Sequence, residues 1–192
     1  MTLELSEVFD LLARTPRVLD GMLRGAPERF IVGTYGPNTF SPYDVVGHLI
    51  TGERTDWVVR LRLVLEKGTS EAFPKYDRYA QFEASAGRTL AELLDEFARL
   101  RTANLATLRA ASLTPGDLAR RGLHPALGEV TLENLLATWV THDLNHIAQI
   151  ARAMAWQHES EVGPWKQYLG ILNLPRTEME ADGVKRKASG RA

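Results

Sequence analysis

Four long stretches of this chain carry apolar residues at intervals of three and four positions, and this pattern constrains the fold most strongly. Such spacing places the apolar side chains on one stripe of an α-helix. The stretches cover residues 4–24, 42–67, 90–111 and 132–158. The sequence shows neither a convincing strand alternation nor an internal repeat. Amphipathic helices of this length bury their stripes against one another, which predicts an all-α protein built as a four-helix bundle.

Capping residues mark the expected starts of three helices. Ser41 and Pro42 begin the second helix, because serine accepts hydrogen bonds from free N–H groups and proline suits the first helical turn. Thr89 with Glu92 forms a capping box for the third helix, and Thr131 caps the fourth. The segments between the helices are predicted to be loops: 25–40, 69–88 and 122–129.

The predicted helices belong to a single domain, residues 1–174. Pro16 makes the first helix either one bent helix or two short ones. A Gly-Pro pair ends the fourth helix, and a short extra C-terminal helix is expected over residues 165–172. Residues 175–192 form a polar tail without apolar periodicity, which we expect to be flexible.

The charge balance excludes several partners. The chain has 23 Lys and Arg residues against 24 Asp and Glu residues, so it lacks the basic excess with which proteins neutralise phosphates. No apolar run reaches membrane-spanning length, and the N-terminal segment lacks the pattern of a signal peptide. We therefore expect a cytoplasmic protein that binds neither nucleic acid nor membrane.

The absence of cysteine limits the chemistry available to the chain. No disulfide, thiolate metal site or cysteine nucleophile can form. A catalytic metal ion must be held by histidine, carboxylate or water ligands, and any thiol that takes part in a reaction must come from outside the protein.

Three of the five histidines lie where they can share a metal ion. His142 and His146 are four residues apart, so both imidazoles project from one face of the fourth helix. His48 flanks the apolar stripe of the second helix and can meet this pair inside the bundle. Three imidazoles suit zinc, nickel, copper or iron(II) and leave coordination positions open. The alternative is a set of half-buried or surface histidines that bind no metal.

Three charged residues occupy positions where an apolar side chain is expected: Glu53, Arg101 and Asp143. An unpaired buried charge is costly, so we expect Arg101 to pair with Glu53 or Asp143 unless these side chains reach solvent. A carboxylate near the metal can orient an imidazole or act as a base. Glu53 and Asp143 are therefore the predicted catalytic residues.

Two other features allow more than one interpretation. Arg60 and Arg62 alternate with leucines and are typical of a solvated helix face, although they can also attract an anionic substrate. His124 and His158 have no partner at ligand spacing and are expected to be surface or cap residues.

Three runs of the sequence resemble the DinB/YfiT-like superfamily of metal-dependent enzymes. They are SPYDVVGHL at residues 41–49, GEVTL at residues 128–132 and HDLNHIAQI at residues 142–150. The resemblance extends from about residue 5 to residue 172. It implies a four-helix bundle, commonly dimeric, with a three-histidine metal site formed by His48, His142 and His146.

The resemblance also implies a class of reaction. Relatives include transferases that use low-molecular-weight thiols such as bacillithiol or mycothiol, and their metal is zinc, nickel or another divalent ion. We expect a homodimeric metal-dependent enzyme that acts on a small molecule, either as a thiol-dependent S-transferase or as a hydrolase. The alternative is a non-catalytic dimeric bundle for stress response or ligand binding, with structural histidines.

Overall fold

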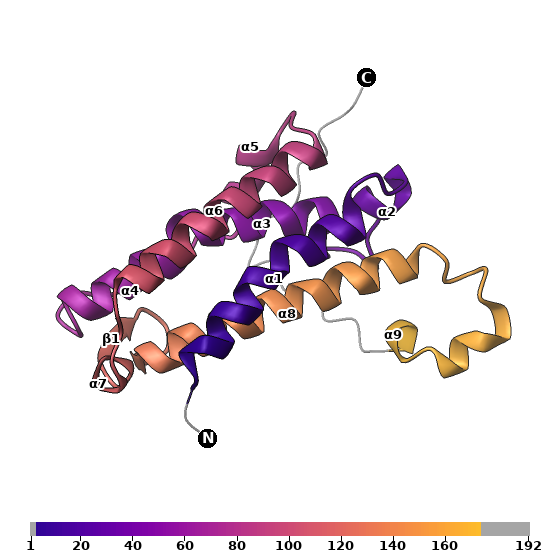
Figure 1. The fold of residues 1–192 in the computed structure, drawn as a ribbon. Coiled ribbons are helices and arrows are strands. Elements are labelled where there is room, and N and C mark those ends of the chain that lie inside the picture. The colour runs from indigo at the N-terminus through magenta and orange to yellow at the C-terminus, as the bar shows by residue number, and fades with distance from the viewer. Residues whose placement is uncertain (1–2, 174–192) are drawn as a thin grey trace.

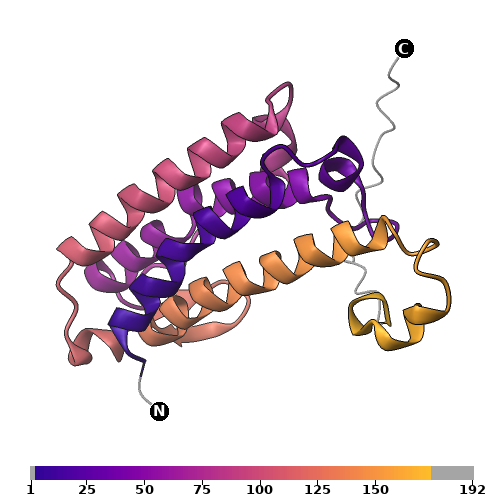
Figure 2. The same ribbon diagram turned by 45° about the vertical axis from the view of Figure 1, so that its right-hand side comes forward.

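The computed structural model describes residues 3–173, and the tail predicted at 175–192 lies outside this range. Its long helices lie side by side along the molecule (Figures 1 and 2). They are α1 (Leu5–Leu23), α3 (Pro42–Thr55) with its continuation α4 (Trp57–Glu66), α6 (Leu90–Ala110) and α8 (Leu132–Trp156). Both α1 and α3 pack against α6 and α8. The predicted all-α four-helix bundle is confirmed in its main features.

The capping residues act as predicted. Ser41 and Thr89 each form a capping box, with Asp44 and Glu92 respectively, and Thr131 caps α8. The first stretch is one helix, α1, with Pro16 inside it. Within the described part of the chain, no helix is both long and apolar enough to cross a membrane.

The bundle core has two apolar clusters separated by a polar layer. One cluster includes Leu12, Trp57, Leu105 and Trp139, and the other includes Leu19, Ile50, Phe97 and Ile150. Between its members of the two clusters, each long helix contributes at least one buried polar residue, and these include Thr15, Glu53, Arg101 and Asp143. Glu53, Arg101 and Asp143, which carry charges on apolar helical faces, therefore lie in a layer across the middle of the bundle.

A β-hairpin replaces part of the loop predicted at 122–129. Strands β1 (Arg121–His124) and β2 (Gly128–Thr131) pair antiparallel, with Arg121 opposite Thr131. The two strands have four residues each and their burial does not alternate, so an apolar–polar alternation does not reveal them. A tertiary contact also holds the hairpin, because the Phe73 amide donates to the Leu123 carbonyl at 2.8 Å.

Short helices also occur in two segments predicted to be loops: α2 (Glu28–Val32) and α5 (Ala80–Ser85). Another short helix, α7 (Pro115–Leu118), lies between α6 and β1. The second predicted helix is divided at Asp56, where the backbone departs from helical geometry between α3 and α4. The short C-terminal helix is a 3₁₀ helix, η1 (Gly163–Tyr168), followed by α9 (Gly170–Asn173).

Candidate metal centre and cavity

Arg101 is the centre of the polar layer, with only 1% of its surface exposed. Its guanidinium donates to Glu53 Oε1 at 2.7 and 3.1 Å and to the two Asp143 oxygens at 2.5 and 3.0 Å. The predicted pairing is confirmed, and it involves both carboxylates. Burial lowers the pKa of Arg101, but the two carboxylates outweigh this effect and raise the pKa above its ordinary value.

Further donors satisfy the two carboxylates. The Thr15 hydroxyl donates to Asp143 Oδ2 at 2.6 Å, and the Trp139 indole N–H donates to Glu53 Oε1 at 3.1 Å. The Asn104 amide donates to Glu53 Oε2 at 3.0 Å. Both carboxylates are thus held inside a hydrogen-bonded network that joins all four long helices.

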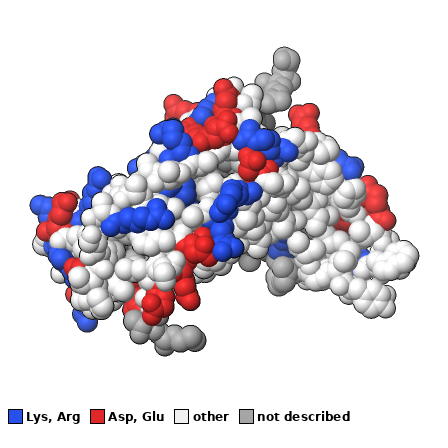
Figure 3. All heavy atoms as spheres, in the orientation of Figure 1, with Lys and Arg blue, Asp and Glu red and all other residues white. Residues whose placement is uncertain are grey.

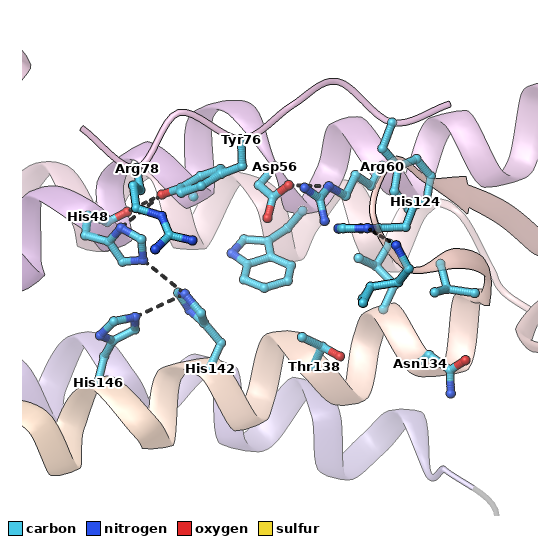
Figure 4. Close-up of a pocket in the computed structure, with 16 residues that line it drawn as sticks. His48, Asp56, Arg60, Tyr76, Arg78, His124, Asn134, Thr138, His142 and His146 are labelled. Carbon is cyan, nitrogen blue, oxygen red and sulfur yellow. Dashed lines mark hydrogen bonds and ion pairs between the residues drawn. The ribbon is translucent and has the colours of Figure 1, made fainter. Parts of the chain in front are cut away.

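The three histidines meet beside this layer. His48 extends from α3, while His142 and His146 extend from α8 (Figure 4). His142 Nε2 lies 3.2 Å from His48 Nε2 and 3.1 Å from His146 Nε2. One ligand nitrogen from each ring lies within 4.8 Å of the others. The structure therefore brings together the trio expected from the sequence.

Two of these imidazoles have a tautomer set by a second hydrogen bond. His146 Nδ1 faces Gln149 Oε1 at 2.8 Å, and an amide oxygen only accepts, so Nδ1 carries the proton. The Tyr76 hydroxyl donates to the His48 carbonyl and accepts from His48 Nδ1, both at 3.2 Å. The Nε2 lone pairs of His48 and His146 therefore point toward the centre of the group, as metal ligands require.

Burial keeps these rings neutral. It is the main cause that lowers the pKa of His48 to about 3 and that of His142 to about 2, and the neighbouring imidazoles lower both further. Burial also lowers the pKa of His146. Neutral imidazole is the protonation state that binds metal ions.

The donor set fits a divalent ion. A metal–nitrogen distance of about 2.0–2.1 Å places adjacent ligand nitrogens roughly 3.0–3.4 Å apart. The measured separations of 3.1 and 3.2 Å agree with this geometry. Facing lone pairs repel unless a proton or a cation lies between them, and the His142 ring can donate one proton to one neighbour only. Within residues 3–173, His142 Nδ1 has no hydrogen-bond partner, so its tautomer is free to adapt to a cation.

The histidines close one end of a cavity of about 410 Å³. The β-hairpin forms the other end (Figure 4). The lining combines an apolar wall with a few polar groups, which is typical of a small-molecule site. Its apolar members include Trp57, Phe73, Leu127, Val130 and Leu135, and its polar members besides the histidine trio include Asp56, Arg60, Tyr76, Arg78, His124, Asn134 and Thr138.

Neither predicted catalytic carboxylate lines this cavity, because Glu53 and Asp143 face Arg101 instead. The carboxylate that does line it is Asp56, which the sequence reasoning missed. Asp56 lies at the break between α3 and α4, and its Oδ1 forms an ion pair with Arg60. Burial raises the pKa of Asp56 and the ion pair opposes the rise.

Two residues expected at the surface contribute to the cavity. Arg60 belongs to the lining, whereas Arg62 is exposed, so the interpretation of both as a solvated face is wrong for Arg60. His124 caps the hairpin turn as expected of a cap residue, since its Nδ1 accepts the N–H groups of Ala126 and Leu127, each at 3.1 Å. Its ring also lines the cavity.

The fold and the site define a helical bundle with a three-imidazole group at one end of a cavity. The family model of the DinB superfamily matches residues 11–150, and the chain belongs to this superfamily. Comparison with the curated proteins finds no match.

One solved structure resembles this fold closely. It is YfiT from Bacillus subtilis, described as a probable metal-dependent hydrolase with an unusual four-helix bundle topology. The two chains are 25% identical, the TM-score is 0.68, and the alignment covers 79% of this chain and 86% of YfiT.

Proposed function

We propose that this protein is a metal-dependent hydrolase of a small molecule, with His48, His142 and His146 as the metal ligands. The convergence of three neutral imidazoles at one end of a cavity carries the proposal. The description of YfiT supports it. Three nitrogen ligands suit zinc or nickel. When bound, such an ion supplies a Lewis acid that activates water or polarises a substrate oxygen.

Asp56 is the proposed general base. Its Oδ1 is engaged by Arg60, and its side chain belongs to the cavity lining. Burial raises the pKa of Asp56, which makes the carboxylate a better proton acceptor near neutral pH. We expect Asp56→Asn to lower kcat by a factor of about 10² to 10⁴ and to leave the metal content unchanged. Equal kcat in the two proteins would refute this role.

Glu53 and Asp143 have a positioning role in this proposal. Asp143 adjoins His142 on α8, and Glu53 lies five residues after His48 on α3. Their shared guanidinium therefore holds the two ligand-bearing helices at a set spacing. Proton transfer by either carboxylate is disfavoured, because both are engaged and away from the cavity.

Thiol transfer is the second candidate reaction. The cavity is roomy enough for a small thiol beside the histidines, and the chain has no cysteine of its own. A metal ion held by the three histidines would lower the pKa of such a thiol, so that its nucleophilic thiolate would form near neutral pH. The description of YfiT favours water as the nucleophile instead.

Metal analysis of untagged protein tests the site. We expect about one zinc or nickel ion per chain, and its loss in His48→Ala and His142→Ala. His158→Ala is the matched control, because that ring lies outside the cavity. Metal content that stays the same in all variants would refute the ligand assignment.

A substrate screen then separates the candidate functions. Esters, amides and phosphate esters are offered to the metal-loaded protein, with and without small thiols. Turnover without thiol supports the hydrolase, and turnover that needs thiol supports the transferase. If no substrate turns over and the protein nevertheless binds small molecules, the non-catalytic bundle is favoured.

A homodimer is also proposed, on the basis of exposed apolar side chains. Leu144 on α8 is 51% exposed, and Trp165 and Tyr168 are 71% and 77% exposed. Figure 3 shows a broad area without charged side chains toward the end of the molecule that carries α9. Exposed apolar surface of this kind marks interaction sites. Light scattering coupled to size-exclusion chromatography tests the dimer, and a monomer at micromolar concentration would exclude it.

A further inference from the structure

The cavity lining carries an excess of positive charge. Two arginines face one carboxylate, Asp56, and this carboxylate is already paired with Arg60. Arg78 has no ion pair or hydrogen bond with any residue in the range 3–173. Two guanidinium groups against one carboxylate give the cavity lining a net positive charge.

The position of Arg78 is set by its neighbour in the loop between α4 and α5. Tyr76 ties this loop to α3 through its two hydrogen bonds with His48, each 3.2 Å long. Figure 4 shows the Arg78 guanidinium extending from the loop toward the histidine group. Arg78 and His48 belong to the lining of the same cavity.

The cavity also has an apolar wall, beside which lie the polar side chains of His124, Asn134 and Thr138. Phe73, Leu127, Val130 and Leu135 line it, and this part includes the hairpin end. Arg78 lines the cavity while remaining exposed to solvent, and a guanidinium binds carboxylates and phosphates through paired N–H donors. A ligand that matches both Arg78 and the apolar wall has a compact oxyanion next to an apolar group.

We propose that Arg78 is an oxyanion-binding residue and that the substrate is a small molecule with a carboxylate or phosphate next to an apolar portion. That this ligand is a substrate rests on the proposed hydrolase function. The binding of an oxyanion by Arg78 does not depend on that function. The histidine group, which would hold the metal, and Arg78 then face the oxyanion end of the substrate, and the hairpin faces its apolar end.

Calorimetry on the metal-free protein tests the binding without any catalysis. The probes are 3-phenylpropionate and phenyl phosphate as oxyanions, and 3-phenylpropionamide as the neutral match of the first. We expect at least one oxyanion to bind at least tenfold more tightly than the amide. Arg78→Ala should abolish this preference, and Arg78→Lys should keep part of it, because lysine retains the charge but not the paired donors.

Arg62→Ala is the control for net charge, because Arg62 is exposed on α4 and lies outside the cavity. It should bind the probes as the parent protein does. Equal affinity for both oxyanions and the amide, or an unchanged preference in Arg78→Ala, would overturn the proposal. If a phosphate preference appears without a carboxylate preference, the substrate class narrows to phosphates.

This experiment is independent of the metal analysis. A protein that binds the oxyanion through Arg78 but holds no metal would refute the hydrolase and retain the anion site. A protein that holds metal at the histidines but shows no oxyanion preference would refute the anion site alone.

Discussion

At the scale of single residues, Arg101 connects the four helices at the middle of the bundle. It holds Glu53 of α3 and Asp143 of α8, and Thr15 of α1 donates to the same Asp143 carboxylate. Its pairing could be predicted, because a charge on an apolar helical stripe needs a partner. That it holds both carboxylates at once depends on the packing of helices distant in sequence.

Replacing Arg101 tests this role. Arg101→Met leaves two buried carboxylates without their cation, so we expect the free energy of unfolding to fall by about 3–5 kcal/mol and metal content to fall with it. Urea denaturation at neutral pH measures the change. The further changes Glu53→Gln and Asp143→Asn should recover part of the loss, because they remove the uncompensated charges. A loss below about 1 kcal/mol would contradict the network.

A substitution of Gln149 tests whether its hydrogen bond orients His146 for metal binding. Its amide oxygen is the partner of His146 Nδ1, so Gln149→Ala should weaken zinc binding by about 10- to 100-fold with little effect on folding. Asn145→Ala, on the exposed face of α8, is the control and should bind zinc as the parent does. A competition titration with a zinc chelator measures both. Equal affinities would mean that this hydrogen bond does not orient His146.

At the scale of elements, the long helices could be predicted and the short elements could not. Ser41, Thr89 and Thr131 signal helix starts through local hydrogen bonds, which depend only on nearby residues. The β-hairpin depends on a distant partner, because Phe73 supports it through a backbone hydrogen bond. Gly122 also lies close to the Phe73 ring, and no sequence pattern predicts this contact.

Gly122 provides the test at this scale. A Cβ at this position would lie 2.6 Å from Phe73 Cζ and 2.8 Å from Val64 Cγ2. We expect Gly122→Ala to lower the free energy of unfolding by about 1–3 kcal/mol, because one of these groups has to move. Gly21→Ala is the control, since nothing lies within 4 Å of its Cβ and alanine favours the helix by about 0.5–1 kcal/mol. Denaturant unfolding compares the two, and a neutral Gly122→Ala would show that the contact is loose.

At the scale of the whole molecule, the candidate metal centre links two helices that are far apart in sequence. His48 lies on α3, while His142 and His146 lie on α8, which packs against α3. An ion bound to all three rings binds only the folded chain, because the unfolded chain does not hold these rings together. Metal binding and folding are therefore coupled.

Metal addition tests this coupling. Zinc at 100 times its dissociation constant should stabilise the protein by about 2.7 kcal/mol, and a chelator should remove this gain. Thermal unfolding with zinc and with chelator measures the difference. The double variant His48→Ala/His142→Ala should show no response to zinc. An equal response in that variant would place the stabilising ion elsewhere.

The sequence by itself determined the long helices, their caps and the candidate trio of histidines. Helical periodicity is local, so a spacing of four residues places His142 and His146 on one face whatever surrounds them. Only the tertiary structure engaged both Glu53 and Asp143 with Arg101 and kept them out of the cavity, and it alone brought Asp56 and Arg78 into the cavity. Those placements depend on a helix break, a loop and a hairpin whose paths are set by contacts between residues far apart in the chain.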